Sequence, residues 1–501
     1  MSAKTFAALA LMGASSVDAF WRMECRGRTG LARIDPIMDS GTVSSHVHTV
    51  HGSSGFSIVA DFDSLTAGNC TSCAVTADKS AYWTPALYFH DTDADTFNLV
   101  PQVGGMLAYY LQRGDDVKAF PQGFQMIAGS NYRRNYTVGD VYSPDPPQSN
   151  WAALKQTGQD DLEQRALGFN CLNYQKDAEA SLYRHYMPDK DYLDANCPDG
   201  LRLELMFPSC WNGEDDSSDH KSHVAYPDLV GNGNCPDTHT QRLVTLFYET
   251  IWDTGDSAFS GKNGEFVVSN GDPTGFGYHG DFMSGWEESF LQNAIDTCTN
   301  ESGELSDCSV FTDNAPLLSE SEMGECTFDM PSALATEDCS ATDMTSLPGN
   351  LPIQSGPEEA TKVGTDPIAS VTSAIGSFFT GSATTTASPY KQSGTKSYSP
   401  EVSSTGAGGV YIQSPDVAVA SVTSSTSTPL TTPAPVVTSE AGVVYEVVST
   451  QTVTTGAEVE EIVWKEPVLY VTEDTTTTVT MAQKMKLRRD HAWRHRHHER
   501  R

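Results

Sequence analysis

The chain has 501 residues, with 31 Lys or Arg against 65 Asp or Glu, and therefore a formal net charge of −34 at pH 7. Such acidity excludes nucleic acid and anionic membrane surfaces as the main partner, because their phosphates would repel most of the protein. No stretch beyond the N-terminus reaches the run of about 18 apolar residues that a membrane span needs, so no transmembrane segment is expected.

Residues 1–19 have the pattern of a secretory signal peptide. Lys4 supplies a positive start, and an apolar core of ordinary signal-peptide length follows at Phe6–Val17. Val17 and Ala19 are small, which places the cleavage site before Phe20. The sequence therefore predicts a secreted, extracellular protein.

All 11 cysteines lie between Cys25 and Cys339. In a secreted chain this number predicts five disulfides and one remaining thiol, with a connectivity that the sequence leaves open. Cys70 and Cys73 form a C-x-x-C pair, but no second such pair completes a zinc ribbon, so a disulfide role is favoured for both. The N-glycosylation acceptors are Asn69, Asn135 and Asn300.

Residues 20–345 are expected to form the folded body. Short apolar runs bounded by Pro or Gly predict strands, and Gly271–Gly280 predicts a loop. Apolar residues at helical spacing and two early acids predict one clear helix at Trp286–Cys298. Together these elements favour a mainly β, disulfide-stabilised β-sandwich or jelly-roll-like domain with long loops and one or two short helices. The predicted strands are Thr84–His90, Met106–Gln112, Phe124–Gly129, Leu201–Leu205, Leu243–Trp252 and Glu265–Ser269.

The composition changes after the body. Residues 346–483 are rich in Ser, Thr and Pro, which predicts a disordered, O-glycosylated, low-complexity stalk. Within it, Val443–Thr455 alternates β-branched residues, as a strand or an aggregation-prone segment does, but extended, glycosylated chain is expected here. Residues 484–501 hold eight Lys or Arg, two acids and four His, and form a basic tail that suits anionic wall polymers, phospholipid or the protein's own acidic surface.

Two histidines are candidate metal ligands. His46 and His48 are two residues apart, so on a strand they project from the same face. Neutral imidazoles in this arrangement suit a divalent metal. His51 falls on the opposite face, and hydrogen-bonding histidines at a sheet edge are the alternative interpretation.

Two later clusters are candidates for acid–base chemistry. Asp219, His220 and His223 share one polar loop in which a carboxylate and Lys221 would tune each imidazole. A second cluster places His279 and Asp281 on either side of Gly280. These five acids and imidazoles are the candidate catalytic residues, and a solvated loop and a tight turn are the alternatives. The aromatic residues Trp211, Tyr278 and Trp286 lie beside these clusters and suit the C–H faces of sugar rings.

Taken together, these segments resemble a fungal secreted family known only as a domain of unknown function, number nineteen-ninety-six. The resemblance covers most of residues 20 to about 310 and implies no established activity. The chain departs from the family pattern at His51, where an apolar residue is typical, and at Ser40-Gly41, where Pro-Gly is typical. The matching motifs are Phe20-Trp21-Arg22 with Cys25, Arg33–Ile37, His46–His48, Lys79–Pro85, Tyr109-Tyr110, Phe207–Trp211, Asp219–His223, and Gly277–Phe282 with Gly285-Trp286.

Two functions remain open from the sequence. The first is a secreted or cell-wall-associated hydrolase or lyase that acts on cell-wall or plant polysaccharide through a His/Asp cluster, with a divalent metal as the candidate cofactor. The second is a non-catalytic glycan-binding or cell-wall adhesion protein. The enzyme hypothesis requires the three clusters to converge on one site, whereas the second function does not. The sequence leaves the oligomeric state open.

Overall fold

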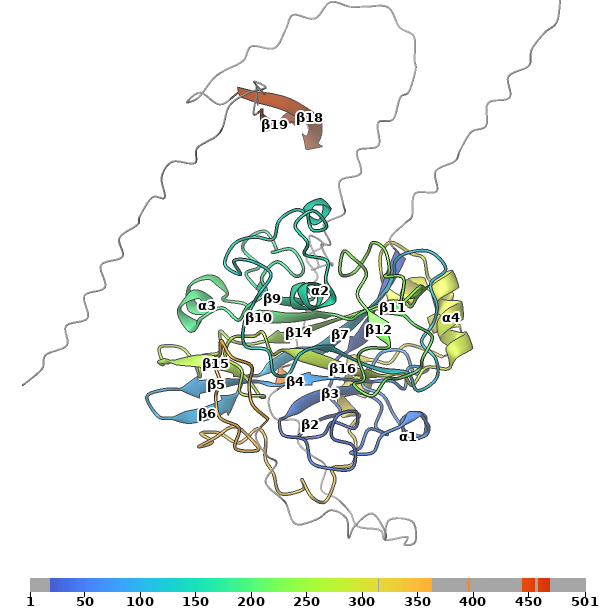
Figure 1. The fold of residues 1–501 in the computed structure, drawn as a ribbon, viewed down its shortest axis with the longest axis vertical. Coiled ribbons are helices and arrows are strands. Elements are labelled where there is room, and N and C mark those ends of the chain that lie inside the picture. The colour runs from blue at the N-terminus through green and yellow to red at the C-terminus, as the bar shows by residue number, and fades with distance from the viewer. Residues whose placement is uncertain (1–18, 314, 363–394, 397–443, 456–457, 469–501) are drawn as a thin grey trace, which may run out of the picture. The chain divides into compact units, whose positions relative to one another are not determined.

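The computed structural model describes residues 19–313, 315–362, 395–396, 444–455 and 458–468 (Figure 1). The chain divides into two compact units, Met1–Val417 and Ala418–Arg501. Among the described residues, no helix is both long and apolar enough to cross a membrane. Residues 1–18, the basic tail and most of the predicted stalk lie outside the described residues.

The first of two large sheets is antiparallel and has the strand order β1-β7-β14-β10-β9, with β17 pairing in parallel beside β7. Its long central strand begins four residues before the predicted Met106–Gln112. The strands are β1 (Ala19–Cys25), β7 (Gln102–Gln112), β14 (Thr245–Trp252), β10 (Leu201–Met206), β9 (Leu167–Cys171) and β17 (Thr395–Lys396).

The second large sheet is also antiparallel, in the order β2-β3-β4-β16-β8. Its strands are β2 (Gly30–Ala32), β3 (His48–Gly52), β4 (Ala81–Pro85), β16 (His279–Met283) and β8 (Gln125–Gly129). Two small sheets flank this pair. They are built from β15 (Gly264–Val268), β5 (Leu87–Asp91) and β6 (Thr96–Leu99), and from β12 (Val224–Ala225), β11 (Cys210–Trp211) and β13 (Gln241–Arg242).

The two large sheets pack face to face as a β-sandwich. Tyr82 of β4 contacts Tyr248 of β14 with ring centroids 5.8 Å apart, and the Tyr248 hydroxyl donates to the Asp281 carbonyl of β16 at 3.1 Å. The Thr49 hydroxyl of β3 donates to Gln102 of β7 at 2.9 Å. The inner faces are lined with fully buried aromatic residues, as expected for the core between two sheets. This confirms the predicted mainly β, disulfide-stabilised sandwich.

The predicted strand Thr84–His90 is in fact two strands in different sheets. The chain leaves the second large sheet at Pro85 and enters the small sheet at Leu87, so only Ala86 separates β4 from β5. Proline lacks the N–H that a continuing central strand would donate, which accounts for the break. The apolar run on both sides hides this change of sheet in the sequence.

The helices are short and lie in the connections. The predicted helix at Trp286–Cys298 is confirmed as α4 (Glu288–Thr297), and the Glu287 side chain caps it by accepting from the Phe290 N–H. The other helices have four to seven residues, too few for a clear periodic signal. They are α1 (Phe62–Thr66), α2 (Gln159–Arg165), α3 (Lys190–Asn196), α5 (Ser309–Thr312) and α6 (Glu320–Glu325), with 3-10 turns at Gln148–Asn150 and Leu305–Asp307.

All 11 cysteines lie in the described part of the chain, where the prediction of five disulfides and one thiol is confirmed. Cys70 and Cys73 are both oxidised, but they pair with Cys326 and Cys25 rather than with each other. Cys339 is the remaining thiol and is buried. The other disulfides join Cys171 to Cys197, Cys210 to Cys235 and Cys298 to Cys308.

The chain directly after residue 345 packs against the body, as contacts of Gln354 and Ala360 show. The Gln354 N–H donates to the Gly271 carbonyl at 2.9 Å, and the Ala360 N–H donates to the Tyr132 carbonyl at 2.8 Å. In the second unit, the alternating segment near Val444 forms a strand instead of the expected extended chain. It is the first arm of an antiparallel hairpin, β18 (Val444–Thr455) with β19 (Glu458–Val468).

A second apolar cluster covers the outer face of the β2-β3-β4-β16-β8 sheet. Val50, Trp83 and Met283 project from the strands, and Ile34 and Phe328 come from the loops above them. This face is therefore shielded from water by the loops that follow β2 and by residues near 330. Any polar group between the sheet and these loops is desolvated.

The outer face of the first sheet contains a pair of buried carboxyl groups. Glu204 of β10 lies directly opposite Glu249 of β14, with Arg202 in contact with both. Burial raises the pKa of Glu249 to about 7; Glu204 adds to this rise and Arg202 opposes it.

We expect this pair to make the stability of the protein depend on pH. A carboxyl group whose pKa is raised in the folded state stabilises the fold below its ordinary value of 4.5, and this contribution is lost as the pH rises through about 7. Glu249→Gln should therefore gain thermal stability relative to the parent between pH 5 and pH 8, as measured by calorimetry. The exposed Glu288→Gln is the control, and parallel curves for Glu249→Gln and the parent would contradict the expectation.

Candidate metal centre

Three histidines converge on the outer face of the second large sheet. His48 begins β3 and pairs with Pro85, while His279 begins β16 on the other side of β4. His46 precedes β3 and flanks the buried Val47 with His48, so both imidazoles lie on one face, as their spacing predicts. Pairing in the sheet thus brings together side chains that are 233 residues apart in the chain.

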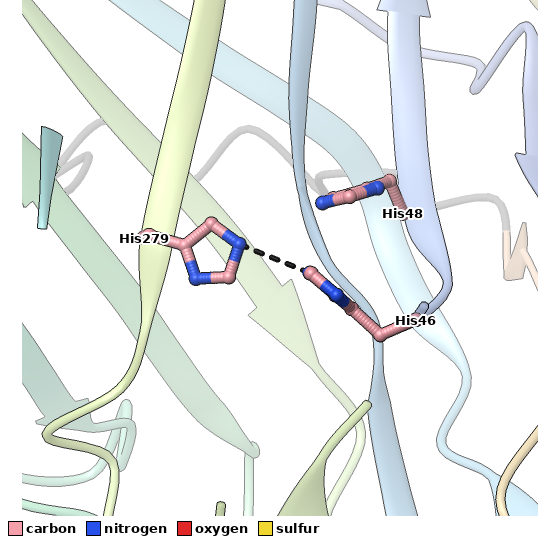
Figure 2. Close-up of side chains that lie close together, drawn as sticks. All are labelled: His46, His48 and His279. Carbon is pink, nitrogen blue, oxygen red and sulfur yellow. Dashed lines mark hydrogen bonds between the residues drawn. The ribbon is translucent and has the colours of Figure 1, made fainter. Parts of the chain in front are cut away.

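The rings face one another closely (Figure 2). The Nε2 atoms of His46 and His279 are 3.0 Å apart, and the His48 ring centroid lies 4.3 Å from that of His46 and 5.8 Å from that of His279. One nitrogen from each ring lies within 4.8 Å of the other two. This spacing suits three imidazoles around a single ion.

Backbone carbonyls fix the tautomers of two of the rings. Nδ1 of His48 donates to the Ile34 carbonyl at 3.0 Å, and Nδ1 of His279 donates to the Gly277 carbonyl at 2.9 Å. Because a neutral imidazole carries one proton, the lone pair of each ring is left on Nε2. The His48 Nε2 is buried without a hydrogen-bond partner. Such carbonyl contacts are typical of histidines that bind a metal through the other nitrogen.

The third ring can adapt to an empty or a filled site. Nδ1 of His46 lies 3.2 Å from the Ser45 hydroxyl, which both donates and accepts. Without a cation, His46 donates from Nε2 to the His279 lone pair, and Ser45 donates to Nδ1. With a cation between the rings, the proton would lie on Nδ1 and the Ser45 hydroxyl would accept a hydrogen bond from it.

Two carboxyl groups lie beside the histidines. Asp35, His48 and Asp281 form a second group whose ligand atoms all lie within 4.8 Å of one another. Asp281 is on the same face of β16 as His279, two residues away, and both of its oxygens are buried without a hydrogen-bond partner. Asp35 accepts from the backbone N–H groups of Ile37 and Met38.

Desolvation dominates the electrostatics of the site. Burial, reinforced by neighbouring rings, holds the pKa of His46 and of His48 well below the ordinary range, and burial lowers the pKa of His279 to about 4. Burial raises the pKa of Asp35 to about 6 and, together with the charge of Asp35, raises the pKa of Asp281 well above its usual value. The site therefore favours three neutral imidazoles.

The residues fit a divalent transition metal. Neutral imidazole and carboxylate are the ligands that zinc and its neighbours prefer. A 2+ ion would balance the charges of two ionised carboxylates, leaving the buried site neutral. An ion between the three imidazoles would give the orphaned Nε2 of His48 a partner, and an ion in the group of Asp35, His48 and Asp281 would do the same for the orphaned oxygens of Asp281.

The site is closed in this structure. His46 and His279 are 3% and 4% exposed, Asp35 and Asp281 are 3% and 1% exposed, and His48 is fully buried. The chain beyond residue 345 contributes to the cover, because a Cβ atom on Gly349 would lie 2.5 Å from the carbonyl oxygen of Ser45. A polymer therefore has no direct path to these atoms.

The residues of the second predicted cluster do not act together. Asp219 and His223 make local structural contacts, and His220 lies near the edge of the histidine site. Asp219 accepts from Ser222 and Lys221 N–H groups and orders its own loop. His223 donates from Nε2 to the Gln125 carbonyl at 2.8 Å, its Nδ1 lies 2.9 Å from the Ser217 hydroxyl, and its ring packs edge-on against Phe124. His220 pairs with Asp216 and is close enough to lower the pKa of Asp35, so it alone of the three interacts with the histidine site.

The aromatic residues proposed from the sequence as sugar contacts need correction. Tyr278 and Trp286 are fully buried: Tyr278 packs on Phe169, and Trp286 donates to the Tyr110 hydroxyl at 2.9 Å. Neither ring is accessible to a sugar. Trp211 is partly buried and donates to the Glu214 carbonyl at 2.6 Å.

Gly280, between His279 and Asp281, does not provide space for a ligand. A Cβ atom on Gly280 would lie 2.5 Å from Leu205 of the facing sheet. The close approach is therefore made by the other sheet rather than by a ligand. Gly280 is also in β16, so the predicted loop Gly271–Gly280 ends two residues earlier than expected.

The remaining sequence predictions concern the surface and the opposite face of β3. His51 faces away from the cluster, as predicted, and its Nε2 lies 3.4 Å from the Gln102 amide.

The acceptor residues Asn69, Asn135 and Asn300 are all exposed, as N-glycosylation requires. Attachment of a glycan at any of them remains a prediction.

Asp35 is the site residue that the sequence analysis did not select. It stands in Arg33–Ile37, a motif of the family resemblance, where a carboxyl group lies between two isoleucines that become buried. The signal that could have identified Asp35 is an acidic residue within a short apolar run, which suggests a buried carboxyl group. Asp35 lies in a loop without a periodic pattern, so the sequence did not show that it faces the histidines.

We expect Asp281→Asn to stabilise the metal-free protein. Burial raises the pKa of Asp281 well above its usual value, so at neutral pH this carboxyl group destabilises the fold; a neutral amide removes that cost, which should raise the free energy of unfolding by about 1–3 kcal/mol and weaken metal binding. Asp272→Asn is the matched control, because Asp272 is equally buried but is bonded to Thr274 and Gly277. It should destabilise the protein. Equal losses for the two variants in denaturant unfolding would argue against a carboxyl group held for a ligand.

We expect each of the three histidines to be needed for metal binding. Replacing His48 or His279 by Ala should weaken Zn²⁺ binding by at least about 100-fold in calorimetric titration, more than the loss of an outer partner costs. His51→Ala, on the same strand but the opposite face, should leave the affinity unchanged. All variants should carry Ala at the four tail histidines, His491, His495, His497 and His498, which would bind metal on their own. Unchanged affinity in His48→Ala would contradict the site.

Comparison with known proteins gives a family but no activity. No curated protein and no solved structure matches the chain. The family model described as "Domain of unknown function (DUF1996)" matches residues 35–286, which is half of the chain and includes all five residues of the metal centre. The chain therefore belongs to the DUF1996 family, as its motifs indicated.

Proposed function

We propose that the protein is a secreted metalloprotein that binds one divalent transition-metal ion between His46, His48 and His279. One observation carries the proposal: three imidazole nitrogens meet within 4.8 Å in a desolvated place, and two of the rings have Nδ1 already committed to backbone carbonyls. Nε2 of His48 is buried without a hydrogen-bond partner, and an ion between the rings would supply one. The signal-peptide pattern and five disulfides support an oxidising, extracellular location.

The carboxyl groups suit a role beside the ion. Asp281 has no hydrogen-bond partner and lies in the same group as Asp35 and His48. It is therefore placed either to ligate the ion or to hold a proton next to it. A bound divalent ion supplies Lewis acidity at such a site. In a hydrolase or lyase acting on cell-wall or plant polysaccharide, Asp281 would transfer that proton to or from the substrate.

One observation favours a second function. All five side chains of the centre are at most 4% exposed, and closed metal sites are typical of structural ions, whereas catalytic sites keep an open position. In that case the ion would stabilise the sheet and its covering loops in a non-catalytic glycan-binding or cell-wall protein. The two uses share the same ligands and differ in whether a substrate reaches them.

Removing the metal distinguishes a catalytic ion from a structural one. The full-length protein, loaded with Zn²⁺ or stripped by a chelator, should be incubated with a panel of neutral and uronic polysaccharides, and both reducing ends and unsaturated products should be assayed. An enzyme should lose at least about 100-fold in rate on chelation and in Asp281→Asn, and should recover when the ion is returned to the parent.

A structural ion gives the opposite pattern. The loaded protein would then release no product, and chelation would only lower its melting temperature, because an ion that binds the folded state stabilises it by mass action. A protein that neither gains stability from Zn²⁺ nor loses activity on chelation would contradict both uses and the proposal itself.

A further inference from the structure

A disulfide-closed loop carries most of the exposed tyrosines of the body. Cys171 and Cys197 are joined, and the segment between them contains Tyr174, Tyr183, Tyr186 and Tyr192. Tyr183 is 50% exposed and Tyr192 is 37% exposed, although large aromatic side chains normally turn inward. The segment leaves the sheet at β9 and includes α3, at the edge of the first large sheet (Figure 1).

Three of these rings and one from a neighbouring loop form a continuous cluster. The Arg184 guanidinium lies 5.6 Å from the Tyr183 ring, 5.9 Å from the Tyr186 ring and 5.1 Å from the Tyr192 ring. Tyr142, which is 77% exposed, contacts Tyr186 with ring centroids 4.8 Å apart. We call Tyr142, Tyr183, Tyr186 and Tyr192 the tyrosine cluster.

Arg184 holds the cluster in place and is not free to bind a ligand. Its guanidinium donates to both oxygens of Glu179 at 2.8 and 2.7 Å, to the Phe169 carbonyl at 2.8 Å and to the Tyr192 hydroxyl at 3.0 Å. The side chain is only 7% exposed. A buried arginine with four hydrogen bonds beneath exposed rings holds them in place before any partner arrives, which lowers the entropic cost of binding.

The charge around the cluster argues for a neutral partner. Residues 171–197 hold five acids and three Lys or Arg, and Glu179 neutralises the one cation at the centre of the cluster. Of the three cations, Arg184 is paired with Glu179 and Lys190 with Asp194, so an anionic polymer would meet the exposed Lys176 against five acids. The chain as a whole, at −34, would also repel it. Phenol rings instead offer an apolar face and a hydroxyl, which together suit the C–H face and hydroxyls of an uncharged sugar.

We propose that the tyrosine cluster is a binding surface for a neutral polysaccharide, separate from the metal centre. The proposal deepens the proposed function, on whose polysaccharide partner it rests, by naming the surface and the charge class of the glycan. It also supplies accessible aromatic rings in place of two of the sugar contacts expected from the sequence, since Tyr278 and Trp286 lie in the core.

Binding of the full-length protein to insoluble neutral glycans tests the surface. β-1,3-Glucan, cellulose, chitin and xylan are the neutral probes, and polygalacturonate is the anionic comparison. The double variant Tyr142→Ala, Tyr183→Ala removes the two most exposed rings of the cluster and should weaken binding to the preferred neutral glycan by about tenfold or more. The corresponding Tyr→Phe pair keeps the rings and should retain most of the affinity.

Two controls keep this experiment specific. Val59→Ala alters a side chain that is 54% exposed on the loops over the other sheet, and it should bind glycan as the parent does. Zn²⁺ binding and the melting temperature of the double Ala variant should match the parent, which shows that the fold and the metal centre are intact. His48→Ala, conversely, should retain glycan binding.

Several outcomes would overturn the proposal. These are equal binding by the double Ala variant and the parent, binding to polygalacturonate alone, and binding that disappears only when the basic residues of the tail are replaced. A parent that binds no glycan in the panel would also overturn it and would count against a polysaccharide partner altogether. Lost glycan binding in the double Ala variant with the metal site intact would support this surface whatever the metal does.

Discussion

The structure depends on one constraint: polar side chains are trapped between a β-sheet and the loops that cover it. The β3-β4-β16 pairing places His48 and His279 on either side of β4, and the loop after β2 brings Asp35 down on them. Buried groups of this kind must find partners or destabilise the fold. Backbone carbonyls of Ile34 and Gly277 satisfy one nitrogen of each ring, and the opposite nitrogens are left facing one another. A cation is the simplest partner that satisfies all of them together.

The same constraint encloses the centre among packed apolar side chains. Val50, Trp83 and Met283 surround it on the sheet, and Ile34 seals it from above. Packing of this density resists rearrangement, so the rings would keep their orientation whether or not an ion is bound. The cost of that packing is that the centre is closed. Catalysis would require the cover to open, whereas a structural ion would not.

The sequence pattern correctly predicted the structural features that depend only on residues close together in the chain. The spacing of His46 and His48 placed both on one face and His51 on the other, and the cysteine count gave five disulfides with one thiol. The helix after Trp286 was visible from its apolar spacing. Each of these features follows from the period of a strand or helix, or from the chemistry of the residue type.

The sequence did not show how the strands pair or how deeply each side chain is buried. His46 and His279 meet only because three strands pair in one order, and Asp35 joins them through a loop that carries no periodic signal. Burial reverses the expected roles of the aromatics: Tyr278 and Trp286 lie in the core, while Tyr142 and Tyr183 remain in water. Aromatic residues look alike in a sequence whether they pack or bind, because only the surrounding fold decides their exposure.

X-ray absorption spectroscopy of the Zn²⁺-loaded protein, in the background without tail histidines, tests the central claim most directly. The account predicts one bound ion with three imidazole nitrogens at about 2.0–2.1 Å, seen by the multiple scattering of the rings, and the loss of one ring's signal in His279→Ala. An ion surrounded only by oxygen, or a spectrum unchanged in His279→Ala, would contradict it.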